Sequence, residues 1–374
     1  MSDVQGRVQA LLDEITATPP EVGLQVAAYH HGELVVDAWS GVADVAAGRP
    51  IDGDTVFAAF SVSKGVTATI AHLLAERGQL AYDAPIAAAW PGFAQHGKAG
   101  ITARHALTHS AGLAHLPIDI RPEDIVDWDR MCDVIEETTP AWEPGRKTGY
   151  HALTFGWIVG ELIHRLDGRP IERILAEDVC APLGIDSLWF GMPESVRPRL
   201  ARFEFAPEPP PDPSPPADDY AAHVVPPGLL PLAGLGNRPE FARAVIPAAA
   251  AVANARSLAR FYAALVGDGV DGQRLLSRER VRIASTLQTD AVDVVVGAAW
   301  PKALGYFLGD ESAVQTCISP TAFGHTGAGG FTAYADPAHD LAFAVCKTYV
   351  LNEIDPVNDP ARRFERELHA ALLS

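Results

Sequence analysis

Ser61 and Lys64 are the pair of side chains whose types and spacing point most directly to chemistry. They belong to the run Ser61-Val62-Ser63-Lys64 at the expected start of a helix, and residues three apart share one face of a helix. A serine hydroxyl becomes nucleophilic when a neighbouring base takes its proton, and a partly desolvated lysine beside a helix N-terminus loses basicity. The run therefore predicts a nucleophilic serine with a lysine partner. The alternative is an N-cap serine beside a solvated lysine.

Tyr150 is the second residue that could take part in proton transfer. It stands in the run 149–152, just before an expected helix over residues 153–166. Near a lysine ammonium the phenolate form of a tyrosine is favoured, so Tyr150 could act as a base for Ser61 or as an acid for a leaving group. An ordinary half-buried tyrosine is the alternative.

The glycine-rich run Gly324–Gly330 is the third candidate, and it contains His325, Thr326 and Ala328. Small residues around a polar pair let a substrate lie close to backbone N–H groups. We expect a turn that precedes a strand and contributes to a substrate site. A glycine-rich turn without a functional role would have the same sequence.

Two other short runs are not expected to form a site. Lys147-Thr148-Gly149 directly precedes Tyr150, so it cannot also supply the distant third element. His109-Ser110 is expected to end a helix, because adjacent side chains do not usually place a nucleophile and its base face to face. The chain has no GxSxG run, which argues against an α/β-hydrolase.

The elements that would position these side chains come from both ends of the chain. Periodic apolar residues predict helices near each terminus, strands next to them, a short strand before Ser61 and a helix that Ser257 could cap. The first expected helix lies within residues 1–18, with its apolar residues between Val4 and Ile15. The other expected helices are at 61–77, 257–265 and 358–373, and the expected strands are at 24–29, 34–39, 56–60, 331–336 and 340–350. The pattern predicts an α/β (α+β) fold with one antiparallel sheet flanked by terminal helices.

A mostly α-helical insert is expected between these parts. Residues 1–80 with 250–374 would form the sheet domain, and residues 81–249 the helical domain, with helices such as 102–108, 123–137 and 153–166. Within the insert, Pro207–Pro216 has seven prolines in ten residues, which favours an extended path. This loop is either a surface connector or a wall of the substrate cleft.

Composition limits the possible partners. The 374 residues include 47 acidic and 29 basic side chains, a net charge of −18, which argues against nucleic acids and anionic membranes. Four scattered cysteines are expected to be buried, and neither a metal site nor a cofactor is expected, because no metal-ligand spacing is present. Without a signal or spanning segment, the protein is expected to be cytoplasmic. The oligomeric state stays open.

The three candidate runs resemble the motifs of the serine β-lactamase and penicillin-binding-protein superfamily. Its SxxK, Tyr/Ser-x-Asn and Lys-Thr-Gly motifs follow one another along the chain in the same order. The likeness is greater to the class C β-lactamase-like family VIII carboxylesterases. Residues 101–113 are similar to that family's "T-x-R-H-L-L-T-H-T-S-G-L" segment, and 181–185 to its "P-L-G-M" turn. The resemblance covers roughly residues 20–350.

The resemblance implies an active site between a sheet domain and a helical domain, and no cofactor. It implies that Ser61 is the acylated nucleophile and that Lys64 and Tyr150 share proton transfer, without saying which is the base. The backbone N–H groups of Ser61 and Ala328 would form the oxyanion hole.

The same resemblance places His325 and Gly327 at the substrate site, where two departures appear. Ala152 stands where the lactamases have Asn, and His325 stands where they have Lys. A histidine is charged only part of the time near neutral pH, so a fixed carboxylate partner is lost. We therefore expect hydrolysis of small-acyl carboxylic esters. Acyl transfer, cleavage of an amide, a D-peptide or a β-lactam, and a non-catalytic scaffold remain alternatives.

Overall fold

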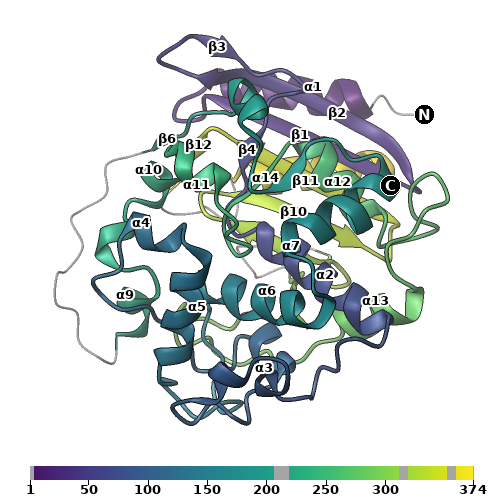
Figure 1. Ribbon diagram of the computed structural model, residues 1–374. Coiled ribbons are helices and arrows are strands. Elements are labelled where there is room, and N and C mark those ends of the chain that lie inside the picture. The colour runs from purple at the N-terminus through teal and green to yellow at the C-terminus, as the bar shows by residue number, and fades with distance from the viewer. Residues whose placement is uncertain (1–3, 206–218, 311–318, 352–358, 374) are drawn as a thin grey trace.

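A seven-stranded antiparallel sheet is assembled from both ends of the chain (Figure 1). The computed structural model describes residues 4–205, 219–310, 319–351 and 359–373. The strands, in spatial order, are β3 (Arg49–Pro50), β2 (Glu33–Asp44), β1 (Gly23–His30), β11 (Leu341–Lys347), β10 (Phe331–Asp336), β9 (Phe323–Gly327) and β8 (Phe307–Leu308). Strand β1 joins the two halves, because Leu24 pairs with Lys347 on β11.

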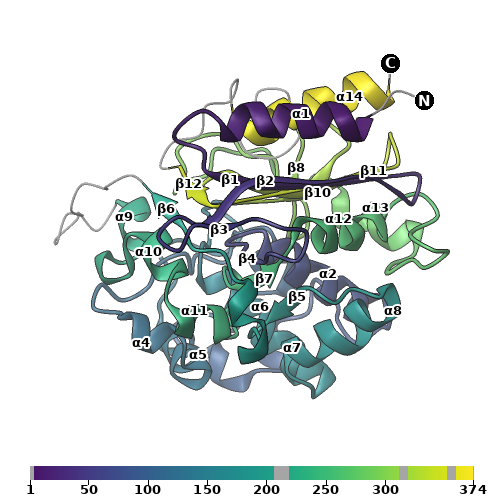
Figure 2. The same ribbon diagram turned by 90° about the horizontal axis from the view of Figure 1, so that it is seen from above.

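Helices α1 (Val4–Thr16) and α14 (Pro360–Leu372) lie side by side over one face of this sheet (Figure 2). The buried residues of α1 recur at helical spacing, Val4, Val8, Leu12 and Ile15, so one stripe of the helix packs on the sheet. Helix α12 (Ala255–Ala263) packs against β1, β10 and β11 from the opposite face. The predicted sheet with terminal helices is confirmed.

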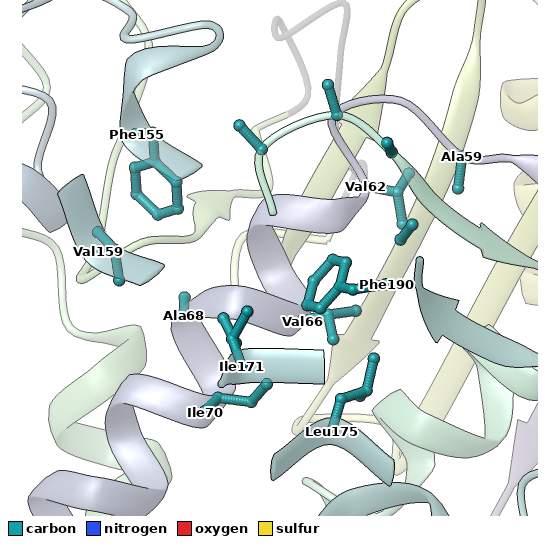
Figure 3. Packing of buried hydrophobic residues seen from close by; sticks show 14 of the residues in the cluster. Ala59, Val62, Val66, Ala68, Ile70, Phe155, Val159, Ile171, Leu175 and Phe190 are labelled. Carbon is teal, nitrogen blue, oxygen red and sulfur yellow. The ribbon is translucent and has the colours of Figure 1, made fainter. Parts of the chain in front are cut away.

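Two central helices, α2 (Ser63–Glu76) and α6 (Thr154–Asp167), pack together beneath the sheet. Every residue of α2 from Ser63 to Ala75 is buried, which is the pattern of an interior helix rather than a surface one. Figure 3 shows Val66 of α2 among the apolar side chains of the neighbouring elements. This packing fixes the start of α2, where the first candidate pair lies.

The described residues between 81 and 249 are mostly helical, as predicted for the insert, and a further helix, α13 (Arg278–Ser285), follows later in the chain. The remaining α-helices of the described residues are α3 (Ala103–Leu107), α4 (Pro122–Ile125), α5 (Trp128–Glu137), α7 (Ile171–Ile174), α8 (Ala181–Leu183), α9 (Tyr220–Val224), α10 (Leu232–Gly236) and α11 (Pro239–Arg243). Other helical turns lie at Ile86–Ala88, Pro91–Ala94, Leu175–Cys180, Glu194–Arg199 and Pro227–Leu229. Two small sheets complete the described structure, β4 (Phe57–Ala58), β7 (Ala251–Ala253) and β5 (Leu188–Phe190), and β6 (Glu204–Phe205) with β12 (Tyr349–Val350). The division at residues 80 and 250 stays a prediction.

The structure corrects several expected boundaries. The α2 helix begins at Ser63, because the two residues before it form a tight turn. The expected helix 123–137 is two helices, since Asp127 caps a new one. The expected strand 340–350 is divided after Lys347, where the chain leaves the main sheet for β6. The glycine-rich run is not a turn throughout, because its first four residues belong to strand β9.

Ser257 does not cap helix α12. The side chain of Asn254 accepts a hydrogen bond from the Ser257 backbone N–H at 2.9 Å, which makes Asn254 the N-cap and places Ser257 inside the helix. Both residue types are good N-caps, so sequence alone does not separate them. Asn254 also donates to Gly53 O at 3.2 Å, a contact with a distant segment that Ser257 would not make.

Some expectations fall only partly within the described residues. Cys132, Cys180 and Cys346 are buried and free, as expected, whereas Cys317 and the run Pro207–Pro216 lie outside the described residues. Within the described part of the chain, none of the helices combines the length and the apolar character that crossing a membrane requires.

We expect Asn254→Ala to lower the free energy of unfolding by about 1 kcal/mol through loss of the cap, or somewhat more because the contact with Gly53 is also lost. Ser257→Ala is the matched control, since only the Ser257 backbone N–H takes part in the cap. Denaturant unfolding of both variants measures the difference. A larger loss for Ser257→Ala than for Asn254→Ala would contradict this assignment.

Candidate active site

Ser61 lies in the tight turn between β4 and α2 and keeps part of its surface exposed. The preceding residue, Phe60, has a left-handed backbone with φ of +45°, which is uncommon for a residue with a side chain. Neighbouring bonds hold this conformation, because the Ser63 hydroxyl donates to Phe60 O and accepts from Ala251 N at 2.9 Å. Sequence reasoning did not single out Ser63, whose role depends on a strand that is distant in sequence.

The Lys64 amine is fully buried next to the Ser61 hydroxyl. Its Nζ is 3.1 Å from Ser61 Oγ, 2.7 Å from Ala152 O and 2.8 Å from Ala248 O. Burial lowers the pKa of Lys64 well below its usual value, because the charged form loses hydration. A neutral amine has two N–H donors, which the two carbonyls take, so its lone pair faces the Ser61 hydroxyl.

Tyr150 completes a group of three with Ser61 and Lys64. Its phenol hydrogen-bonds the Ser61 side chain, and Lys64 Nζ is 4.8 Å from the centroid of its ring. Burial raises the pKa of Tyr150 far above its ordinary value, and the negative charge of Asp293 raises it further. Of the two roles left open for Tyr150, base or acid, the raised pKa favours the acid. With Lys64 neutral, no ammonium is present to stabilise a phenolate, and Tyr150 is a phenol.

Strand β9 runs next to the Ser61 turn and brings the third candidate run to the same place. A Cβ at Gly327 would lie 2.7 Å from Ala59 O, so the strand approaches this closely only with glycine there. Ala328 follows at the start of the β9–β10 turn and is half-buried. The structure thus brings the end of β9 against the residues that precede Ser61.

His325 of β9 is 1% exposed, so its side chain is packed inside the protein and does not face solvent. Its ring lies 4.2 Å from that of Phe307 and 6.0 Å from that of Tyr150. Burial lowers the pKa of His325 well below its usual value. The ring is therefore neutral. Its Nδ1 donates to Thr326 O at 2.5 Å, which leaves Nε2 as a buried acceptor without a partner.

Two further histidines hold the Tyr150 segment and were not predicted to do so. His109 Nδ1 accepts from His151 N at 3.1 Å, and the His109 ring lies 5.2 Å from the Tyr150 ring. His151 Nε2 accepts from Leu113 N at 3.1 Å, and burial lowers the pKa of His151 to about 4. The run His109-Ser110 does end a helix, as expected, since it follows α3.

The second run that was not expected to form a site, Lys147-Thr148-Gly149, lies away from the third candidate run. Lys147 Nζ lies 5.7 Å from the ring centroid of Tyr220, so its side chain is engaged on the helical side rather than at β9. Among the residues that the structure describes, no group of three or more His, Cys, Asp or Glu side chains is arranged to hold a metal ion.

Comparison with known proteins is consistent with this arrangement. A family model described as Beta-lactamase matches residues 8–367. The chain belongs to the Beta-lactamase family. It is 34% identical over 356 residues to the esterase/beta-lactamase LipL of Mycobacterium tuberculosis, an alignment that covers 89% of this chain and 78% of the relative.

Solved structures agree with the family assignment. A penicillin-binding protein homologue from Caulobacter crescentus has a TM-score of 0.88 at 31% identity, covering 99% of this chain and 98% of that chain. A protein described as a family VIII carboxylesterase has a TM-score of 0.87 at 29% identity, covering 97% of both chains. The predicted superfamily and its fold are confirmed.

Gly327→Ala should destabilise the protein by about 1–3 kcal/mol, because the new methyl group would press on the backbone at Ala59. Gly100→Ala is the control, since a Cβ there meets no atom within 4 Å. Thermal unfolding of the two variants tests this. Equal midpoints for the two variants would show that β9 does not need the glycine.

Proposed function

We propose that this protein is a serine esterase that hydrolyses carboxylic esters of small acyl groups through an acyl-enzyme on Ser61. The observation that carries the proposal is the buried Lys64 amine, 3.1 Å from Ser61 Oγ, with two backbone carbonyls occupying its N–H donors. This arrangement supplies a base for the hydroxyl without any metal or cofactor.

In the first step, Ser61 Oγ attacks the ester carbonyl carbon while its proton passes to Lys64 Nζ. The tetrahedral oxyanion then collapses, and the C–O bond to the alcohol breaks. Tyr150, as a phenol, gives its proton to the departing alkoxide oxygen and recovers one from the Lys64 ammonium. Water then attacks the acyl-enzyme by the reverse transfers, releasing the acid and regenerating the Ser61 hydroxyl.

The backbone N–H groups of Ser61 and Ala328 are proposed to stabilise the oxyanion. Ser61 precedes α2 by two residues, and Ala328 directly follows strand β9, which lies against the Ser61 turn. Backbone donors at such positions cost no reorganisation during the reaction, and losing one typically lowers kcat by about 10²–10³-fold.

Two features favour an uncharged apolar ester. His325, which is neutral and buried, offers no positive charge for a carboxylate. Ala152 has no amide to bind an acyl-amide group, and its methyl group packs in a small apolar cluster with Trp142 and Val294. Both features fit a simple ester better than a peptide or a β-lactam.

Hydrolysis of a β-lactam is the second candidate, because LipL is named as both an esterase and a β-lactamase. Acyl transfer to an alcohol or amine would use the same acyl-enzyme, with a different acceptor in the second step. Product analysis with an added alcohol distinguishes transfer from hydrolysis.

Ser61→Ala should abolish hydrolysis of p-nitrophenyl butyrate and labelling by a fluorophosphonate, since both need the Ser61 oxygen. Ser285→Ala, on the distant helix α13, should retain both. Wild-type enzyme should turn over the ester at a far higher kcat/KM than nitrocefin. Full ester hydrolysis by Ser61→Ala would refute the proposal, and a preference for nitrocefin would favour the second candidate.

Lys64→Met should lower kcat by about 10²–10⁴-fold, because it removes the base at nearly constant volume. In the wild type, kcat/KM should fall as the pH decreases, since a protonated Lys64 cannot accept the Ser61 proton. The midpoint should lie well below the usual lysine pKa, because burial lowers the pKa of Lys64. A pH–rate profile measures this limb, which belongs to Lys64 and Tyr150 as a coupled pair. A rate that is independent of pH on the acid side would contradict the prediction.

A further inference from the structure

Residues 289–302 form a loop whose two ends are tied together. Lys302 N donates to Thr289 O at 2.8 Å, and Gln288 N donates to Lys302 O at 2.8 Å. Inside the loop, Gly297 N donates to Asp293 O at 2.7 Å. These bonds make the loop a closed unit that can hold a side chain in a fixed place.

The loop encloses an ion pair with almost no access to solvent. Lys302 Nζ is 3.0 Å from Asp293 Oδ2, and the two side chains are 1% and 0% exposed. Removing two charges from water costs about as much free energy as their attraction returns, so such a pair adds little to stability by itself. Its other contacts show what it does.

Asp293 binds the backbone of Tyr150. Its Oδ1 accepts from Tyr150 N at 3.1 Å, and also from Val295 N and Val296 N at 2.9 and 3.0 Å. A second bond joins the same two segments, because Val294 N donates to Thr148 O at 2.9 Å. The carboxylate therefore fixes the Tyr150 backbone to a loop that is 143 residues away in sequence.

The same loop also contacts the ring of Tyr150. Trp300 lies 5.4 Å from the Tyr150 ring centroid, and Phe307, just beyond the loop, lies at 5.7 Å. Lys302 Nζ sits 5.7 Å from the Trp300 ring and 6.0 Å from the Phe307 ring. The ion pair thus supports both the backbone and the aromatic surroundings of the tyrosine.

We infer that Asp293, held in place by Lys302, is a positioning residue that sets the orientation of the Tyr150 phenol for proton donation to the leaving group. The inference rests on the proposed role of Tyr150 in ester hydrolysis and adds a residue outside the three candidate runs. Asp293 acts through Tyr150 and does not contact the reacting atoms.

The charges around the phenol support this role. The titratable groups that face it are Lys64, His109 and His325, whose pKa values burial lowers, and Asp293. The ion pair of Asp293 with Lys302 lies beside them, and within it the carboxylate of Asp293 contributes to raising the pKa of Tyr150. The proton stays on the phenol, where the departing alkoxide needs it.

The test compares two esters with different needs for proton donation. The leaving group of p-nitrophenyl butyrate departs readily as an anion, whereas that of ethyl butyrate needs a proton. Asp293→Ala should lower kcat for ethyl butyrate by about 10²-fold, the effect of a misplaced group, with a much smaller loss for p-nitrophenyl butyrate. KM should change by less than about threefold, because binding contacts stay in place. Tyr150→Phe should show the same selective loss.

Asp293→Asn combined with Lys302→Met is the conservative variant. The Asn carbonyl can still accept the three backbone N–H groups, and no buried lysine is left unpaired. This variant should recover most of the ethyl butyrate activity that Asp293→Ala loses. Asp290→Ala, at an exposed position of the same loop, is the matched control and should behave as wild type.

The outcomes separate this inference from the proposed function. Equal losses for both esters in Asp293→Ala, or none, would overturn the positioning role. Fluorophosphonate labelling of Ser61 in the same variants shows whether the nucleophile still works. Full activity in Ser61→Ala would overturn the esterase itself, whatever the Asp293 variants do.

Discussion

The desolvated Lys64 amine is the interaction on which the rest of the site depends. Two backbone carbonyls, Ala152 O and Ala248 O, complete its hydrogen bonding, and they come from segments 88 and 184 residues away. The first turn of α2 is held to the second of these segments again through Thr67, which donates to Pro247 O at 2.7 Å. Because a buried lysine has to be surrounded from several sides, the fold and the reactive amine are formed together.

The polar side chains around this amine are mostly neutral. Burial lowers the pKa values of His109, His151 and His325, so these rings serve as hydrogen-bond donors and acceptors and as packing for Tyr150. The net charge of −18 therefore says little about the site. In this mostly neutral environment the carboxylate of Asp293 adds to the rise in the pKa of Tyr150, although burial of the phenol contributes more.

The sequence predicted best what depends on neighbouring residues. Ser61 and Lys64 are three residues apart, and the terminal helices and hairpins have regular apolar spacing, so local rules were sufficient. The cap of α12 was misassigned because Asn254 and Ser257 are equally good locally, and the tertiary bond to Gly53 decides between them. The first half of Gly324–Gly330 was not recognised as a strand, since glycine disfavours strands and only its partner β10 makes the pairing visible.

Asp293 and the protonation of Tyr150 could not be obtained from sequence at all. The first needs a contact across 143 residues, and the second needs the burial of the phenol and of its charged neighbours. Such quantities exist only in the folded chain. Family resemblance placed Tyr150 at the site, but it carried no information on which proton the tyrosine holds.

The pairing of β1 with β11 has a consequence for biosynthesis. The register Leu24 with Lys347 means that an apolar strand emerges from the ribosome more than three hundred residues before the strand that covers its edge. Until then β1 and β2 present an open edge that other nascent chains can join, as incomplete sheets commonly do. The main sheet is completed only when the C-terminal strands have been made, so the N-terminal hairpin is exposed to self-association for most of synthesis.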